Sequence, residues 1–463
     1  MLQLSLNSDS PMPLVDQIVS GIRGHIDDRL LRTGMRLPPI RGFAEQHAVS
    51  RFTVVEAYDR LVALGYVTSR RGSGFYVAGH RQAPKVEMKS GELERAFDNA
   101  GVMYQSLEDA PERLKAGVGW LPPEWMDEEG VRRNVRTLSR RPDVHATSYG
   151  TALGYRPLRE QLRVKLTDFG IATTPDQIIL THGATQALDI VTRTLIQPGD
   201  CVFVDDPGYW NLFANLRLYG ANLVGVPRGD DGPDPEALEA LLREHKPKAF
   251  YTHSVLHNPT SGNLSATVAH RVLQLAARHD LPIVEDDTYG DYHPGHAHRL
   301  AALDGLDRVI YVGSFSKTLS ANLRVGFLAA RPELVRTFTD VKLFTSVGSS
   351  EFAERLIHDM LIEGHYRKTI ERLRGRLAQA MDDGLELLDR AGFRPFAEPN
   401  GGMFVWAARP DLDPVELARD AAGHGIVLAP GNLFRPQLQA TSYLRFNAAY
   451  LGDPRIDRFL KAI

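Results

Sequence analysis

Residues 309–330 read VIYVGSFSKTLSANLRVGFLAA, in which two apolar runs enclose a polar segment that contains Lys317. Short apolar runs rich in β-branched residues are typical of core strands. A lysine between two such strands lies where water is scarce, and burial lowers its pKa because the charged form loses its hydration. A neutral amine can attack an aldehyde. The segment therefore predicts a buried, nucleophilic lysine.

Groups that bind phosphate lie close to this lysine. Ser314 and Ser316 supply hydroxyl donors, and Arg324, seven positions after Lys317, supplies a guanidinium fork. Together they meet the needs of a phosphate monoester. A lysine with a phosphate cradle points to pyridoxal 5'-phosphate held as a Schiff base on Lys317. A solvated loop lysine beside a serine-rich turn is the alternative, and the Ser-x-Ser-Lys pattern alone does not decide between the two.

Two upstream segments place polar residues directly after predicted strands. Asn258 belongs to HNPTSG, which follows an apolar run, while Asp286 and Tyr289 belong to IVEDDTY. In open α/β sheets, ligands bind beyond the carboxyl ends of the strands. Asp286 can keep a pyridinium nitrogen protonated, so that the ring acts as an electron sink. Asn258 and Tyr289 can both hydrogen-bond a phenolate oxygen on the ring.

This ordered set (Asn-Pro, Asp-x-x-Tyr, Ser-x-Ser-Lys, Arg) resembles the fold-type I aminotransferase superfamily, and within it the kynurenine/α-aminoadipate aminotransferase-like branch. The resemblance implies an α/β fold with a mostly parallel, seven-stranded-type sheet and a small carboxy-terminal α+β domain. Amides at a helix N-terminus can bind the phosphate, and here they belong to Gly183, Ala184 and Thr185. The family's aromatic residue that stacks on the ring maps onto Tyr209, with Trp210 as its rival. The family's tyrosine that reaches the phosphate of the neighbouring subunit's cofactor maps onto Tyr149.

Arg445 lies inside the apolar segment SYLRFN. A buried arginine needs an anionic partner. In the family this position clamps the α-carboxylate of an amino acid with bidentate geometry. The alternative is a structural ion pair.

Residues 1–80 show a different pattern. An amphipathic helix begins near Pro13, a short helix covers about 40–47, and a third helix begins at Arg51 with Ser50 as its N-cap. Residues 65–77 predict a β-hairpin with a basic, glycine-rich tip. A helix, a helix-turn-helix and a hairpin in this order indicate a winged helix.

The charge of this unit agrees with DNA binding. Nine arginines, no lysine and seven acidic residues give it a net charge of +2, against −5 for the rest of the chain. A recognition helix enters the major groove with its N-terminus first, and wing arginines reach phosphates or the minor groove. The segments LPPIR, VSRFTV and RGSGFYV resemble the amino-terminal domain of GntR regulators; the alternative is a surface helical hairpin with scattered arginines. The candidate DNA contacts are Arg41, Ser50, Arg51, Thr53, Arg70, Arg71 and Gly72.

The whole arrangement resembles the MocR subgroup of GntR transcriptional regulators. We predict a winged-helix domain over 1–80, a charged linker over 81–116 and an aminotransferase-like domain over 117–463, with its large part at about 150–330 and its small part at about 331–463. The resemblance implies a homodimer that swaps its DNA-binding units, binds a DNA operator, and senses an amine, an amino acid or the cofactor itself.

A working aminotransferase that carries a winged helix is the second hypothesis, because Lys317, Asp286 and Arg445 are all present. One departure counts slightly against the MocR assignment: many such regulators carry a tyrosine two residues after the aspartate, where Thr288 stands here. A cofactor-free scaffold is a third hypothesis, which requires Lys317 not to bind. The effector, the operator and the sign of regulation are not encoded in any motif that we recognise.

Composition narrows the remaining possibilities. A chain of 463 residues exceeds one core's usual size, so at least two domains are expected. Its single cysteine, Cys201, excludes an intrachain disulfide and a cysteine-rich zinc site, and we expect a buried structural thiol and no metal. The absence of a signal-peptide pattern and of a long apolar run leads us to expect a soluble, cytoplasmic protein.

Overall fold

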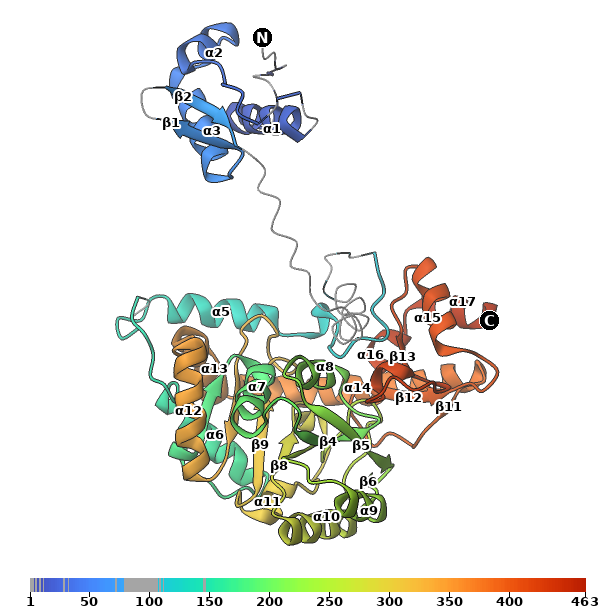
Figure 1. The fold of residues 1–463 in the computed structure, drawn as a ribbon. Coiled ribbons are helices and arrows are strands. Elements are labelled where there is room, and N and C mark those ends of the chain that lie inside the picture. The colour runs from blue at the N-terminus through green and yellow to red at the C-terminus, as the bar shows by residue number, and fades with distance from the viewer. Residues whose placement is uncertain are drawn as a thin grey trace. The chain divides into compact units, whose positions relative to one another are not determined.

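The chain divides into two compact units, Met1–Lys89 and Ser90–Ile463, which are described separately (Figure 1). Arg71, Gly72 and most of the predicted linker lie outside the part of the chain that is described. The computed structural model describes residues 4, 6–7, 10, 12–27, 30–31, 33–70, 73–78, 107, 110, 112–144 and 147–463.

The first unit is the predicted winged helix. Its apolar positions recur at helical spacing, so that Ile18 and Ile22 meet Val54, Tyr58 and Leu61 in one core. The two strands pair antiparallel, as the glycine-rich tip predicts. The elements are α1 (Leu14–Asp27), α2 (Ile40–Gln46), α3 (Arg51–Ala63), β1 (Val67–Arg70) and β2 (Gly74–Val77).

A side-chain cap fixes the start of α3, the second helix of the helix-turn-helix. The Ser50 hydroxyl accepts a hydrogen bond from the Thr53 amide at 3.0 Å and lies 2.7 Å from the Thr53 hydroxyl. The cap therefore satisfies one of the amides that a helix start leaves without a partner. It also holds Arg51, Phe52 and Thr53 in the first helical turn.

A mixed sheet forms the centre of the second unit, with strand order β3-β10-β9-β8-β7-β4-β5-β6. The five adjacent strands β9, β8, β7, β4 and β5 run parallel to one another. Strand β10 is antiparallel to both of its neighbours, β3 and β9, and the two-residue edge strand β6 is antiparallel to β5. The fold class predicted from the sequence is thus confirmed. The strands are β3 (Ile178–Thr181), β4 (Cys201–Asp206), β5 (Asn222–Gly229), β6 (Gly232–Pro233), β7 (Phe250–Thr252), β8 (Ile283–Asp286), β9 (Val309–Ser314) and β10 (Gly326–Ala329).

Helices cover both faces of this sheet, which explains why β3, β7, β8, β9 and β10 are buried along their whole length. Successive residues of a strand point to opposite faces: Ile178 and Leu180 belong to one core cluster and Ile179 to the other. One face carries α6 (Arg156–Asp168), α9 (Pro235–Glu244), α10 (Ala266–His279), α11 (Leu300–Asp304) and α13 (Glu351–Ile362), and the other carries α7 (Gly183–Leu195), α8 (Trp210–Leu218) and α12 (Pro332–Ser346).

A four-stranded antiparallel sheet, β11-β12-β14-β13, forms the smaller carboxy-terminal domain. Its strands are short, and its helices pack on one shared core. The elements are β11 (Arg394–Pro395), β12 (Phe404–Ala408), β13 (Ala429–Pro430), η4 (Gly431–Phe434), β14 (Tyr443–Asn447), α15 (Pro414–Gly423), α16 (Ala448–Leu451) and α17 (Pro454–Ala462). Elements outside the small domain that have not yet been named are η1 (Pro123–Trp125), α5 (Glu128–Leu138), η2 (Pro175–Gln177) and η3 (Gly290–Tyr292).

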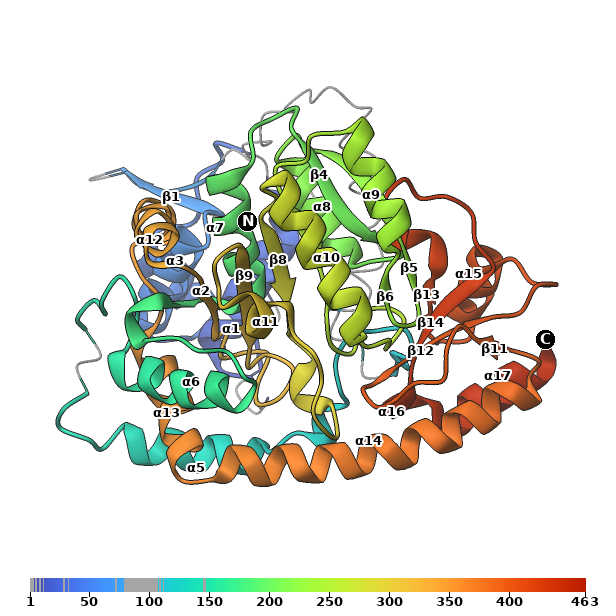
Figure 2. The ribbon, with the colours of Figure 1, turned by 90° about the horizontal axis from the view of Figure 1, so that it is seen from below.

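The long helix α14 (His365–Arg390) joins the large and small domains, as its course along one side of the unit shows (Figure 2). Ile370 and Leu377 pack in a core of the large sheet, whereas Met381 and Leu388 pack in the core of the small domain. The small-domain core therefore begins within α14, later than predicted, because α12 and α13 pack on the large sheet.

The end of the predicted linker also differs from the prediction. Leu114 and Ala116 are buried in the core of the small domain. The Leu114 amide donates to the Gly425 carbonyl at 2.8 Å, and the Val427 amide donates to the Leu114 carbonyl at 2.8 Å. Residues 112–116 are thus a packed segment beside β13.

Among the described helices, none combines the length and the apolar character needed to cross a membrane.

Ser50→Ala should weaken α3 because it removes the helix cap. We expect the opening free energy of residues 51–63 to fall by about 1 kcal/mol. Hydrogen exchange of the full-length protein, followed by mass spectrometry of the peptides, measures this change. Ser50→Thr should retain most of the protection, and equal protection in all three proteins would contradict the cap.

Candidate functional site

The carboxyl ends of the central strands bring polar side chains to one edge of the large sheet. Asp286 ends β8, Ser314 ends β9, and His253 directly follows β7. Most of the predicted cofactor residues, together with three that were not predicted, line one pocket at this edge. Its lining is Ala184, Thr185, Leu188, Tyr209, His253, Asn258, Asp286, Thr288, Tyr289, Ser314, Ser316, Lys317 and Arg324.

Lys317 lies in the loop that joins the antiparallel strands β9 and β10. Burial, reinforced by the charges of Arg445 and Arg324, lowers the pKa of Lys317 to about 8. The Lys317 amine lies 5.4 Å from the ring centroid of Trp120, and the Tyr292 hydroxyl donates a hydrogen bond to the Lys317 carbonyl. The lysine is therefore held in place, and a larger share of it is neutral than for a lysine in water.

Asp286 is buried yet ionised. Burial by itself raises the pKa of a carboxyl group, but the charge of His253 and hydrogen bonds to the carboxylate outweigh it and lower the pKa of Asp286. The Thr288 amide and hydroxyl donate to one carboxylate oxygen at 3.0 and 2.5 Å, and His253 Nε2 lies 3.5 Å from the other. A buried carboxylate of this kind suits a pyridinium nitrogen.

Hydroxyl groups, an arginine and a helix start form a cradle beside the lysine. Arg324 adopts a left-handed backbone conformation (φ 52°), and its guanidinium donates to the His182 carbonyl at 3.1 Å and to the Ser316 hydroxyl at 3.4 Å. Gly183, the first residue of α7, has φ 78°, and a Cβ there would lie 2.8 Å from the Arg324 guanidinium. Only glycine allows this close approach. The amides of the first turn of α7 provide the electropositive end that an anion needs.

Arg445, on β14 of the small domain, is a buried cation with neutral partners. The guanidinium carbon lies over the rings of Phe404 and Phe434, 4.5 and 4.7 Å from their centroids. It donates to the Asn258 side-chain oxygen at 2.7 Å and to the Gly117 carbonyl at 2.6 Å, whereas its Nε has no hydrogen-bond partner.

Burial lowers the pKa of Arg445 to about 10, because no opposite charge compensates for the lost hydration. The structural ion pair that was the alternative role for this residue is not found: within the described part of the chain, no carboxylate lies within ion-pair distance of Arg445. The site therefore offers an unmatched positive charge.

His253 was missed by the sequence analysis, although it follows β7 at the same edge as Asp286. A second buried carboxylate fixes it: the His253 amide donates to Asp205 at 3.2 Å, and Arg228 pairs with Asp205 at 3.1 Å. His257 Nε2 also lies 3.5 Å from Asp205. Asp205, His253 and His257 have the spacing of metal ligands. Because Arg228 already neutralises Asp205, we interpret this cluster as support for Asp286.

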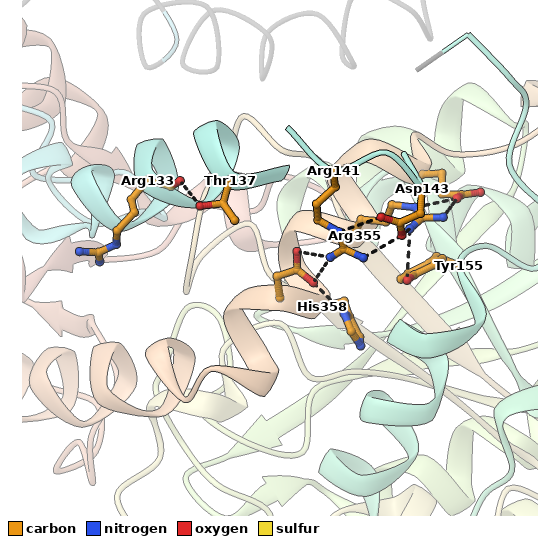
Figure 3. A network of polar contacts seen from close by, with 9 residues as sticks. Arg133, Thr137, Arg141, Asp143, Tyr155, Arg355 and His358 are labelled. Carbon is orange, nitrogen blue, oxygen red and sulfur yellow. Dashed lines mark hydrogen bonds and ion pairs between the residues drawn. The ribbon is translucent and has the colours of Figure 1, made fainter. Parts of the chain in front are cut away.

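Tyr149 lies outside this pocket. Its side chain is 88% exposed and lines a separate hollow beside Ser349 and Glu351 of the loop and helix after α12. Ion pairs hold the neighbouring backbone on α13 (Figure 3): Arg141 and Arg355 share Asp143, at 2.8 and 3.0 Å. Tyr149 thus lies outside the pocket that contains its own chain's lysine, and its contact with the neighbouring subunit stays a prediction.

The predicted DNA contacts that are described lie on one helix-turn-helix and one wing. Arg41 is in the first turn of α2, Arg51 and Thr53 are in the first turn of α3, and all three lie at least partly in solvent. Arg70 ends β1, and its guanidinium lies 4.7 Å from the ring centroid of Tyr76. Ser50 contributes the helix cap. The contacts predicted for Arg71 and Gly72 lie outside the described residues.

Two family models match the chain: aminotransferase class I and II over residues 128–463, and bacterial regulatory proteins of the gntR family over residues 14–77. The probable rhizopine catabolism regulatory protein MocR of Rhizobium meliloti is 30% identical over 92% of this chain and 88% of its own length. The 2-aminoadipate transaminase of Thermus thermophilus is 32% identical over 74% of this chain and 89% of its own length.

A solved structure agrees with the fold of the second unit. The α-aminoadipate aminotransferase LysN of Thermus thermophilus, in complex with N-(5'-phosphopyridoxyl)-L-leucine, superposes with a TM-score of 0.72. It is 29% identical in sequence, and the match covers 80% of this chain and 98% of that one.

Competitive acetylation at a series of pH values should show Lys317 reacting with a midpoint near pH 8, about two units below an ordinary lysine. The reason is that only the neutral amine reacts, so reactivity rises with pH and levels off above the pKa. Peptide mapping of the cofactor-free protein measures the labelling of each lysine.

Lys342 provides a matched control, since burial also lowers its pKa to about 8 and its amine is bound to the Ala152 carbonyl at 2.7 Å. Added pyridoxal 5'-phosphate should protect Lys317 and leave Lys342 unchanged. The assignment would be contradicted if the cofactor protected another lysine, or if Lys317 were acetylated with the same pH midpoint as the surface lysines.

Proposed function

Because the chain belongs to the aminotransferase class I and II family and is a MocR-type transcriptional regulator, with a gntR-family domain ahead of the aminotransferase domain, we propose that it senses an amino acid. In this proposal the second unit binds pyridoxal 5'-phosphate through Lys317. Occupation of the site then changes the affinity of the first unit for its DNA operator.

The observation that carries this proposal is the excess positive charge of the pocket. Lys317 and Arg324 line it and Arg445 adjoins it, whereas Asp286 is the single acidic residue in its lining. Buried charges are costly unless they are paired. A ligand carboxylate would pair the buried Arg445, and a ligand phosphate would pair Arg324, which is exposed where it lines the pocket. A simple structural role would have placed carboxylates of the chain itself beside them.

The residues present fit pyridoxal 5'-phosphate. When bound, this cofactor supplies an aldehyde for the lysine and a ring that accepts electrons. The cradle of Gly183, Ala184, Thr185, Ser314, Ser316 and Arg324 would hold the phosphate, Asp286 the ring nitrogen, and Tyr209 the ring face. The Asn258 side-chain oxygen accepts a hydrogen bond from Arg445. The side-chain NH2 group of Asn258 would therefore donate to the phenolate oxygen, and the Tyr289 hydroxyl would do so by giving up its present hydrogen bond to the Gly119 carbonyl.

The effector would be an amino acid because Arg445 selects a carboxylate. Its guanidinium lies against the aromatic rings of Phe404 and Phe434, and the fork of a guanidinium matches a carboxylate in bidentate geometry. The unpartnered Nε is a donor that a carboxylate oxygen can use. A simple amine would leave this donor and the charge unmatched.

The backbone beside Arg445 offers a route from the site toward the DNA-binding unit. Arg445 binds the Gly117 carbonyl, the Asn447 amide group binds the Val118 and Trp120 carbonyls at 3.0 and 2.8 Å, and the Tyr289 hydroxyl binds the Gly119 carbonyl at 3.3 Å. This segment continues toward the amino terminus into the chain that leads to the first unit. A carboxylate on Arg445 would compete with the Gly117 carbonyl, so that effector binding would alter the start of the connection.

A working transaminase is the second candidate function. The intact set of Lys317, Asp286 and Arg445 favours it, as does the similarity to the Thermus transaminase. Sustained formation of a keto acid from an amino acid and 2-oxoglutarate would support turnover. Binding of the amino acid without turnover would support the sensor.

Arg445→Gln should weaken binding of an amino acid far more than binding of the amine that lacks its carboxyl group. Loss of a buried, charge-assisted pair costs about 2–5 kcal/mol. A titration of the cofactor-loaded protein, followed by its visible absorbance, compares the two ligands. Arg409→Gln, which alters a small-domain arginine paired with Asp411 outside the pocket, is the control. Equal weakening for both ligands would show that Arg445 is structural.

The regulator proposal predicts a genomic fragment that the protein prefers over random duplex. Arg70→Ala should lower the affinity for this fragment, and the difference from wild type should shrink as the salt concentration rises. The slope of log affinity against log salt concentration should become flatter by up to about 1, because one phosphate contact is lost. Competition binding at several salt concentrations measures both effects, with Arg419→Ala in the second unit as the control. If no fragment outcompetes random DNA while keto acid is formed, the transaminase takes the place of the regulator.

A further inference from the structure

An apolar patch lies on the exposed side of α3, the recognition helix of the first unit. Phe52 is 76% exposed and Val55 is 36% exposed, one helical turn apart. The buried side of α3 is formed by other residues, among them Val54, Tyr58 and Leu61. Phe52 and Val55 belong neither to the core of this unit nor to the partly buried residues that pack against it. The fold of the unit therefore does not account for them.

The surroundings of this patch are basic at the start of the helix. Arg51 precedes Phe52, and Arg41 is exposed on α2, the first helix of the same helix-turn-helix. The first acidic residue of α3 is Glu56, and its carboxylate is paired with Arg60 at 2.7 Å. An apolar patch flanked by cations is complementary to an anionic partner that also presents an apolar group.

The major groove of DNA meets this description. Its walls are phosphates, and the thymine 5-methyl group is the apolar feature among the base edges, where phenylalanine and other apolar side chains contact it. The first turn of a recognition helix is the part that reaches base edges. The Ser50 and Thr53 hydroxyls lie 2.7 Å apart in the helix cap. Arg51 and Phe52 of the first turn, and Val55 at the start of the next, therefore remain for contact with the bases.

We propose that Phe52, together with Val55, contacts the 5-methyl groups of thymine in the operator and so determines part of its sequence. The inference rests on the proposed DNA-binding function. Side chains three positions apart on a helix have Cβ atoms about 5–6 Å apart, and base pairs rise about 3.4 Å. Phe52 and Val55 of one chain therefore cover one or two adjacent base pairs.

The test replaces each thymine of the preferred duplex, one at a time, by deoxyuridine, which removes only the methyl group. Wild-type protein should lose about fourfold in affinity at one or two positions, the effect expected for one buried methyl group. Phe52→Ala should bind the thymine duplex more weakly and should no longer distinguish thymine from uracil at those positions. Competition binding with the full-length protein gives all the affinities.

Controls separate this contact from others. Leu64→Ala alters another exposed apolar residue, 58% exposed just past the end of α3, and should keep the full response to uracil. Phe52→Leu retains an apolar side chain and should keep part of the response to uracil. The salt slope of Phe52→Ala should equal that of wild type because no charge is removed. Hydrogen exchange across α3 would show that the variants are folded.

The outcomes are distinct from those of the regulator proposal. Equal wild-type affinity for the thymine and uracil duplexes at every position would overturn the inference while leaving a preferred operator, and hence the regulator, intact. An equal loss by Phe52→Ala on both duplexes would overturn it too. If Phe52→Ala changed the molecular mass of the protein's assembly in solution but still distinguished thymine from uracil as wild type does, the patch would be a protein contact instead. Lack of any preferred duplex would defeat both proposals.

Discussion

The unmatched charge of Arg445 is the constraint around which the second unit is arranged. A buried guanidinium that faces neutral oxygens is costly, and here three regions of the chain share in holding it. The small domain supplies the rings of Phe404 and Phe434, the large domain supplies Asn258, and the segment before η1 supplies the Gly117 carbonyl. The residue thus connects both domains with the start of the connection to the first unit, which is where a signal from a bound carboxylate would have its effect.

The edge of the large sheet concentrates the remaining chemistry for a topological reason. Parallel strands end together, so that Asp286, Ser314 and His253 meet although they come from three different strands. The antiparallel strand β10 then returns the chain past Gly183, which places Arg324 beside the start of α7. Helix α14 packs in the cores of both domains, and a ligand held between them is therefore positioned by rigid elements.

The first unit carries the two kinds of side chain, basic and apolar, that the proposed DNA contacts would use. In protein–DNA complexes, arginines supply attraction to phosphates that depends on salt and not on sequence, whereas contacts with base edges supply the specificity. Arg70 stacked on Tyr76 belongs to the wing, and the first turn of α3 carries Arg51 beside the exposed Phe52. Charge and apolar surface thus lie close together on one small domain, while the second unit, with its net negative charge in the sequence, contains the ligand site.

Local patterns in the sequence determined the winged helix, the α/β fold, the Ser50 cap and the pocket residues around Lys317, because strand runs, turn residues and caps depend on neighbours along the chain. Only the tertiary structure decided which distant groups meet. Asn258 and Arg445 are 187 positions apart, and His253 reaches Asp286 from another strand. The sequence analysis assigned α12 and α13 to the small domain, but nothing local says which core a helix joins, and these two pack on the large sheet. Burial and pairing, which set the pKa of Lys317 and leave Arg445 without a carboxylate, exist only once the chain has folded.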